Sequence, residues 1–148
     1  MFGIDIKRES LRDDDDTRPD HAVGRIFIDD FVESFRIKLG YWSVDDYRRS
    51  WCAALQVLEE NKHSRSCLAV SMSDPATTNF IFLWPLYREA DVVYVQNSVL
   101  FLDEAKSFNP DSPWLSVPPR ERVNEDGQAI SEWMTDMASI REFRRSIC

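Results

Sequence analysis

The residues that could perform chemistry in this chain are few. Cys67 lies four positions after His63, and a cysteine beside a histidine can act as a nucleophile with its base. Such catalysis also needs a group that orients the histidine and a site for the oxyanion, and no motif marks either one. We therefore interpret Cys67 as a core-facing or half-buried thiol and His63 as a surface histidine.

Metal and phosphate sites are equally poorly marked. His21 and His63 do not have the spacing of a zinc-binding helix. The run Asp13–Asp16 offers four adjacent carboxylates, but it lacks the turn glycine and the spaced ligands of a calcium loop, so we predict a solvated or disordered tail. The chain has only four glycines and no glycine-rich phosphate loop. We expect no metal and no cofactor.

Adjacent carboxylates could in principle act as general acids and bases. The pairs are Glu59-Glu60, Asp103-Glu104 and Glu125-Asp126. Neighbouring acids are far more common on solvated turns and helix faces, so the sequence gives little support for an enzyme.

The cysteines and the apolar runs indicate a compartment. Cys52, Cys67 and Cys148 show no pairing motif and no ligand spacing, and an odd count without a secretion signal fits reduced thiols. The longest apolar run has eight residues, from Phe80 to Tyr87, whereas a spanning helix needs about 20. We predict a soluble cytoplasmic protein without a membrane partner.

The charge distribution favours a basic partner. The 148 residues carry a net charge of −8, and residues 66–140 hold most of the excess acid. A negative field repels nucleic-acid phosphates and accelerates the encounter with basic proteins. The charge alone is equally compatible with a simpler explanation, in which the excess acidic residues only keep the protein soluble.

The apolar pattern predicts the elements that position these groups. We expect the structured chain to begin near Gly24, with two strands before residue 40. Ser43 is the expected N-cap of a helix over residues 44–60, buried through a helically spaced stripe. That stripe consists of Tyr47, Trp51, Ala54, Leu55 and Leu58.

Three strand-like runs follow between Leu68 and Leu102, close enough together to form an antiparallel meander. Pro85 predicts that the middle strand is an edge, ends early or carries a bulge. Four aromatic residues on these runs could stack on unpaired bases, but in this acidic region we interpret them as core. They are Phe80, Phe82, Trp84 and Tyr94.

The C-terminal part has fewer regular signals. Residues 128–134 could form a last strand or begin a helix, and from Asp136 onward a terminal helix is predicted, with Thr135 as its cap. Trp114, in a proline-rich loop, is either an anchor for a partner or a residue that packs back onto the sheet.

Over residues 40–143 the chain contains short motifs, rich in rare residue types, that occur in the same order in a known protein family. They include Tyr41-Trp42, Asp46-Tyr47, Ser50-Trp51, Leu68–Met72, Thr78–Phe82 with Trp84, Val93–Asn97, Asp126-Gly127 and Ile130–Trp133. The chain resembles the CdiI immunity proteins of contact-dependent growth inhibition, in particular their Enterobacter cloacae type.

The resemblance implies a partner and a fold. Such proteins bind the C-terminal toxin domain of a cognate CdiA protein one-to-one, and in this branch the toxin is similar to colicin nucleases that cut 16S rRNA. The implied fold is α+β: an antiparallel sheet of about five to seven strands with a meander core, one long helix after the first strands and a C-terminal helix. Its likeness to Whirly single-strand-binding proteins keeps a nucleic-acid-binding module as the alternative function.

We therefore expect a polar, partly disordered segment over residues 1–23 and a single immunity-protein domain over residues 24–148. The protein should block the active or RNA-binding surface of a basic nuclease toxin and bind no nucleic acid itself. Carboxylates on turns and loops around the meander are the predicted toxin-binding residues. They are Glu89, Asp91, Asp103, Glu104, Asp111, Glu125 and Asp126.

Overall fold

The computed structural model describes residues 1–7, 21–105 and 107–148. These residues form eight strands, two α-helices and a short 3-10 helix. In chain order they are β1 (Phe2–Lys7), β2 (His21–Ile28), β3 (Phe31–Lys38), α1 (Val44–Glu59), β4 (Arg65–Ser71), β5 (Phe80–Glu89), β6 (Val92–Gln96), β7 (Ser98–Phe101), η2 (Pro113–Ser116), β8 (Glu132–Asp136) and α2 (Met137–Ile147).

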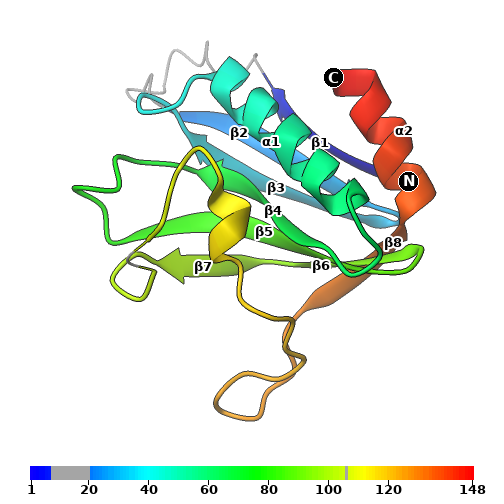
Figure 1. Cartoon of the computed structure of the whole chain (residues 1–148). Coiled ribbons are helices and arrows are strands. Elements are labelled where there is room, and N and C mark those ends of the chain that lie inside the picture. The colour runs from blue at the N-terminus through cyan, green and yellow to red at the C-terminus, as the bar shows by residue number, and fades with distance from the viewer. Residues whose placement is uncertain (8–20, 106) are drawn as a thin grey trace.

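The strands form one mixed sheet in the order β1-β2-β3-β4-β5-β6-β8, and β7 pairs with β5 beside β6. Every pairing is antiparallel except β3 with β4, which are parallel and joined through Lys38 and Ser71. α1 lies over the sheet and α2 stands beside β1 and β8 (Figure 1). The α+β class with an antiparallel meander is confirmed, although the described residues contain eight strands rather than five to seven.

Ordered structure begins earlier than the expected boundary at Gly24, so that prediction is wrong. Phe2, Ile4 and Ile6 are buried in β1, which pairs antiparallel with β2, and β2 itself begins at His21. The segment reads as polar because charged residues alternate with its few apolar ones, yet that alternation is the pattern of a half-buried strand. The carboxylates at Asp13–Asp16 lie outside the described residues.

The helix α1 follows the prediction closely. The Ser43 side chain accepts a hydrogen bond from the Asp46 amide, and the Asp46 side chain accepts one from the Ser43 amide, which completes a capping box. All five residues of the predicted stripe are buried. Trp51 Nε1 donates to the carbonyl of Ala69 at 2.8 Å, which fixes the helix on β4.

The meander is also present, but Pro85 does not act as expected. β5 continues through Pro85 to Glu89 with partners on both sides, so it is neither an edge nor shortened. The register irregularity lies on β4, between Ala69 and Ser71. The predicted last strand divides at Asn97 into β6 and β7, so neither Trp84 nor Pro85 has a register partner on that side of β5. A gap in the ladder at this point suits proline, which has no amide to donate.

The C-terminal ambiguity resolves as a strand followed by a helix. Residues Glu132–Asp136 form β8 against β6, and α2 begins at Met137. Asp136 is the N-cap, since its side chain accepts from the Ser139 amide at 2.7 Å. The predicted cap Thr135 is wrong because it is a buried strand residue that pairs with Val93.

The core contains most of the large apolar residues, with Trp51, Trp84 and Tyr47 among the largest fully buried side chains. Phe31 stacks on Trp133 with ring centroids 4.2 Å apart, and Trp133 contacts Trp84 at 5.9 Å. These rings join residues from β3, β5 and β8, strands that lie far apart in the sequence. Among the described residues, no helix is both long and apolar enough to cross a membrane.

Candidate functional site

The Cys67 thiol does not have the environment of a nucleophile. Cys67 is fully buried in β4, and burial raises the pKa of its thiol, which keeps the reactive thiolate form rare. His63 is exposed, and its Nδ1 lies 2.9 Å from Glu89 Oε2. No group of three or more His, Cys, Asp or Glu within the described ranges is arranged to hold a metal ion.

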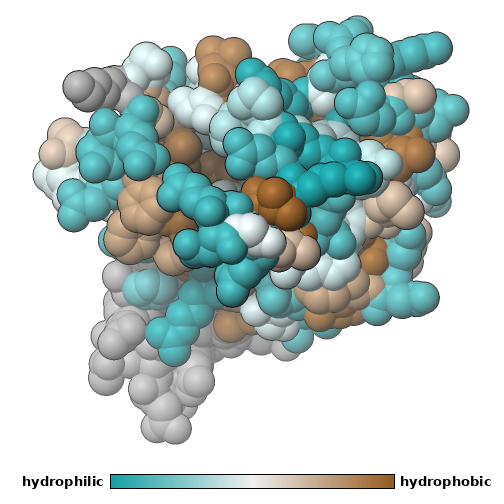
Figure 2. All heavy atoms as spheres, turned by 90° about the horizontal axis from the view of Figure 1, so that it is seen from below, coloured by the Kyte–Doolittle hydropathy of each residue, from teal (hydrophilic) through white to brown (hydrophobic). Residues whose placement is uncertain are grey.

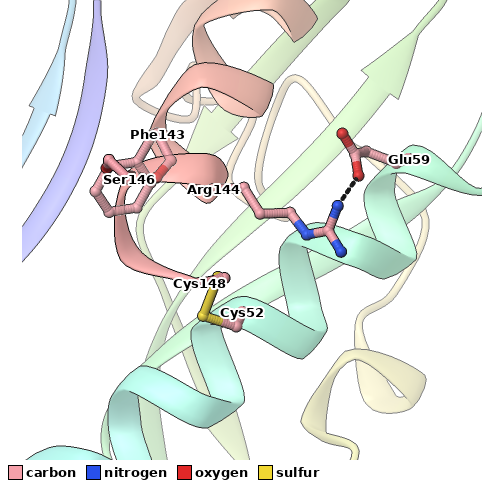
Figure 3. The surroundings of a disulfide bond; sticks show 6 residues. All are labelled: Cys52, Glu59, Phe143, Arg144, Ser146 and Cys148. Atoms are coloured by element: carbon pink, nitrogen blue, oxygen red, sulfur yellow. Dashed lines mark hydrogen bonds and ion pairs between the residues drawn. A yellow bond between two sulfur atoms is a disulfide. The ribbon is translucent and has the colours of Figure 1, made fainter.

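Two of the cysteines are paired, contrary to the prediction of reduced thiols. Cys52 on α1 forms a disulfide with Cys148, with Cα atoms 6.0 Å apart, and Cys67 is the free cysteine (Figure 3). The two cysteines are separated by 96 positions in the sequence, so no local motif predicts that they pair. Arg144 on α2 contacts Glu59 on α1 in the same region, and the two links hold the terminal helix against α1.

All seven predicted toxin-binding acids are exposed, but the fold does not gather them into one site. Glu89 is the last residue of β5, and Asp91 lies in the turn that leads from it to β6. Asp103 and Glu104 follow β7, whose Phe101 pairs with Phe80 at the opposite end of β5. β5 has ten residues, which gives a length of roughly 30 Å at about 3.3 Å per residue.

The other three acids lie at two further places. Asp111 borders a shallow depression on the exposed side of α1, which Asp46 and Arg49 also line. Glu125 and Asp126 lie at the tip of a loop, closed at its base by the bridge from Val123 to Ala129.

That loop, residues 122–130, projects from the body of the molecule (Figure 1) and faces the viewer in Figure 2, where hydrophilic residues surround isolated hydrophobic ones. The Asn124 side chain accepts from the amides of Asp126 and Gln128, each at 2.9 Å, and this shapes the tip.

A half-buried ion pair supports the base of the loop. Arg120 donates to both oxygens of Glu132, at 2.8 and 2.6 Å, and its guanidinium lies 3.7 Å from the centre of the Tyr94 ring. Gln96 Nε2 donates to Glu132 at 2.8 Å and to the carbonyl of Glu121 at 3.0 Å. The hydrogen bonds from Arg120 lower the pKa of the Glu132 carboxyl.

The aromatic residues of the meander are only partly core. Trp84 is buried and Tyr94 half-buried, whereas Phe80 and Phe82 are each 43% exposed, so the interpretation of these two as core is wrong. Val99 and Phe101 on β7 are exposed as well.

Little in the sequence indicates that Phe80 and Phe82 are exposed, because the exposed residues of β5 are as apolar as its buried ones. Trp114, by contrast, is half-buried and packs against the core, as the second of its two interpretations predicts.

Comparison with known proteins gives three matches. The family model of the CdiI N-terminal domain matches residues 37–143. The immunity protein CdiI of Enterobacter cloacae subsp. cloacae is 40% identical over 148 residues, which cover 99% of each chain. A chain of the solved CdiA-CT/CdiI toxin and immunity complex from Enterobacter cloacae superposes with a TM-score of 0.88 at 40% identity, covering 99% of this chain and 98% of that one.

Proposed function

Because this chain belongs to the CdiI family, we propose that it is an immunity protein that binds the C-terminal toxin domain of a cognate CdiA protein and neutralises it. The observation that carries the proposal is the match to a toxin–immunity complex over 99% of this chain at 40% identity. Two chains this similar share a backbone, and the matched one belongs to a complex with a toxin. A one-to-one complex is the expected stoichiometry.

We propose further that the toxin is a basic nuclease that cleaves 16S rRNA and that binding covers its active or RNA-binding surface. The resemblance to the Enterobacter cloacae branch implies the nuclease, and the net charge of −8 supports it. A protein that binds RNA needs basic side chains for the phosphates, and carboxylates of an inhibitor can take the place of those phosphates. Since ribosomes are cytoplasmic, we propose that protection takes place there.

The seven predicted acids fit this proposal best as a long-range field. A standard interface covers about 800 Å² on each partner, whereas Glu89 ends β5 and Asp103 lies near the other end of that strand, after β7. Exposed charges need not touch the partner to accelerate its approach, because the field extends about 8–10 Å at physiological salt. We propose that all seven steer the toxin and that only one group contacts it.

The proposal is tested by co-expressing this chain with the C-terminal toxin domain of its cognate CdiA protein. We expect growth to be restored, intact 16S rRNA, and a purified complex whose mass equals one copy of each chain. A CdiA toxin domain of unrelated sequence serves as the control and should remain lethal. Continued killing by the cognate toxin, or two separate peaks in gel filtration, would contradict the proposed function.

The alternative, a single-strand-binding module, has one structural observation in its favour, the exposed rings of Phe80 and Phe82. Bases stack on such rings, but sequence-tolerant binding also requires a positive groove along the backbone. Retention of a fluorescent RNA oligonucleotide at low salt would support the module, and the inhibitor should show none.

A further inference from the structure

We propose that the toxin docks on an aromatic platform at the uncovered end of the meander. The platform consists of Phe80, Phe82, Val99 and Phe101. This inference rests on the proposed function and specifies the surface that performs it. The partner that fits the platform is a toxin surface with an apolar centre and lysine or arginine around it.

The platform arises from the register of β5 with β6 and β7. Phe80 lies opposite Phe101 and Phe82 opposite Val99, and residues two apart on a strand share a face, so all four side chains point the same way. The rings of Phe80 and Phe82 have centroids 5.5 Å apart, and those of Phe80 and Phe101 are 6.4 Å apart. The four residues therefore form one continuous apolar surface.

The same face of β5 is core at its other end. Trp84 and Leu86 continue the row, and Leu86 lies opposite Val95; these three residues are 1% exposed or less. Phe35 and Trp133 cover Trp84, with ring centroids 6.0 and 5.9 Å away. At Phe82 the exposed fraction of the residue rises to 43%. The first residues of β5 and the paired strand β7 therefore extend beyond the side chains that cover Trp84.

The exposed area is large enough to matter. With aromatic side chains of 150–250 Å², these exposed fractions correspond to roughly 300 Å² of apolar surface in one place. Patches of this size on soluble proteins often mark binding sites. An interface needs about 800 Å² per partner, so the platform would form the centre and the surrounding residues the rim.

The residues around the platform determine the charge of its partner. Asp103 and Glu104 follow β7 after Leu102, and Asp74 lies in the loop that leads into β5. From Ser66 to Ala105 the sequence contains no Lys or Arg except Arg88, which is 6% exposed.

Just before the start of β7, the Asn97 side-chain amide Nδ2 donates to Glu33 Oε2 at 3.5 Å. Lys38, an exposed cation at the end of β3, bridges to Ser71, the residue opposite Phe82, so one side of the rim is basic. An apolar centre whose other sides carry carboxylates complements a mainly basic protein surface and repels the phosphates of RNA.

The test compares platform variants of the full-length protein with a matched control. Phe80→Ser and Phe101→Ser, alone and together, remove exposed rings, and Met134→Ser removes a side chain of similar exposure, 58%, from β8, which pairs with β6 and not with β5 or β7. We expect each platform substitution to raise the Kd for the cognate CdiA toxin domain at least tenfold, mainly through faster dissociation, and the double variant to lose protection. Met134→Ser should change the Kd less than threefold.

Urea denaturation of each variant separates binding from folding, because side chains this exposed should leave the midpoint within a few tenths of a molar of the parent. Should a serine variant unfold, Phe101→Lys provides the second measurement: it retains a long side chain and brings a cation toward the basic toxin. We expect it to weaken binding at least as strongly as Phe101→Ser.

Three outcomes would overturn the inference. Unchanged toxin affinity in the folded double variant would exclude the platform while leaving the proposed function intact. Binding of an RNA oligonucleotide that the double variant loses would assign the platform to RNA, and concentration-dependent dimerisation that it loses would assign it to a second copy. Failure of the unmodified chain to bind the toxin would instead refute the proposed function itself.

Discussion

At the scale of single residues, Arg88 shows how the fold uses a buried cation. Arg88 is 6% exposed on β5, and its guanidinium donates to the carbonyls of Leu58 and Glu59 at 3.2 and 3.4 Å and to that of Ala90 at 2.8 Å. The last turn of α1 has no basic residue of its own. Arg88 therefore supplies from another strand the positive charge that a helix C-terminus favours.

Replacing Arg88 by Ala should lower the free energy of unfolding by about 2–4 kcal/mol, because the change leaves buried carbonyls without donors and removes packed methylenes. Arg88→Lys should recover part of the loss. The measurement is urea denaturation followed by tryptophan fluorescence. The control is Arg145→Ala, an exposed position on α2, where a similar loss would show that the effect does not come from the carbonyl contacts.

Glu132 makes stability depend on pH at the residue scale. Its pKa is lowered, first by the Arg120 hydrogen bonds, from the ordinary glutamate value of 4.5. The stabilisation is therefore complete above the unfolded-state pKa and disappears as the pH falls through the folded-state pKa. Glu132→Gln should cost about 1–3 kcal/mol at pH 7 and progressively less below about pH 4.5. Equal costs at pH 7 and pH 3, measured against Glu125→Gln, would contradict the ion-pair explanation.

At the scale of elements, the terminal helix α2 is attached to the rest of the molecule by several kinds of contact. It packs against α1 and β1 and closes the chain beside the N-terminal strand. Phe143 contacts Phe2 edge-on with centroids 5.6 Å apart. Arg141 and Arg144 both lie near the Glu59 carboxylate. The helix therefore has apolar and ionic attachments besides the disulfide, and these persist in a reducing compartment.

Cys148→Ser should lower the free energy of unfolding by about 2–4 kcal/mol under oxidising conditions, because the Cys52 link closes a loop of nearly a hundred residues in the unfolded chain. The protein should still fold, and dithiothreitol should have the same effect on the parent and none on the variant. Thiol titration of the denatured, unreduced parent should find one reactive cysteine, Cys67. Three would show that the disulfide is absent in solution.

At the scale of the whole molecule, we propose separate roles for charge and shape. In the proposed complex the net charge of −8 acts on the toxin at a distance, whereas the apolar platform acts only on contact. Long-range charge changes mainly the association rate, and a buried apolar contact changes mainly the dissociation rate. The two contributions can therefore be separated by kinetics.

Raising the salt concentration from about 0.05 M to about 0.5 M should slow association with the toxin by roughly tenfold or more while leaving dissociation nearly unchanged. Two double variants that change the net charge by the same amount show whether the position of the charge affects the toxin-binding rates or only its sum does. Glu89→Lys/Asp91→Lys should slow association only, whereas Asp103→Lys/Glu104→Lys, beside the platform, should also accelerate dissociation. Surface plasmon resonance gives both rates, and identical effects of the two pairs would contradict a contact at the platform.

Much of the fold could be predicted from local patterns. The apolar stripe of α1 and its Ser43 cap appear in the sequence because a helix places residues three and four apart on one face. The meander is also predictable from local sequence, since its strand-like runs follow one another too closely for parallel pairing. β1 was missed because its partner β2 lies beyond a charged stretch, and Pro85 was misjudged because the interruption lies in the neighbouring strand, at Asn97, and not in β5 itself.

By itself the sequence determined the family, the acidic character, the long helix and the meander, all of which depend on residue types and their spacing along the chain. Only the tertiary structure decided that Cys52 reaches Cys148, that the seven acids lie at separate places, and that Phe80 and Phe82 are exposed while Trp84 is buried. These properties depend on which distant segment covers which part of a strand. Burial of an apolar strand is a relation between layers, and residues alternating along one strand look the same whether or not a second layer covers them.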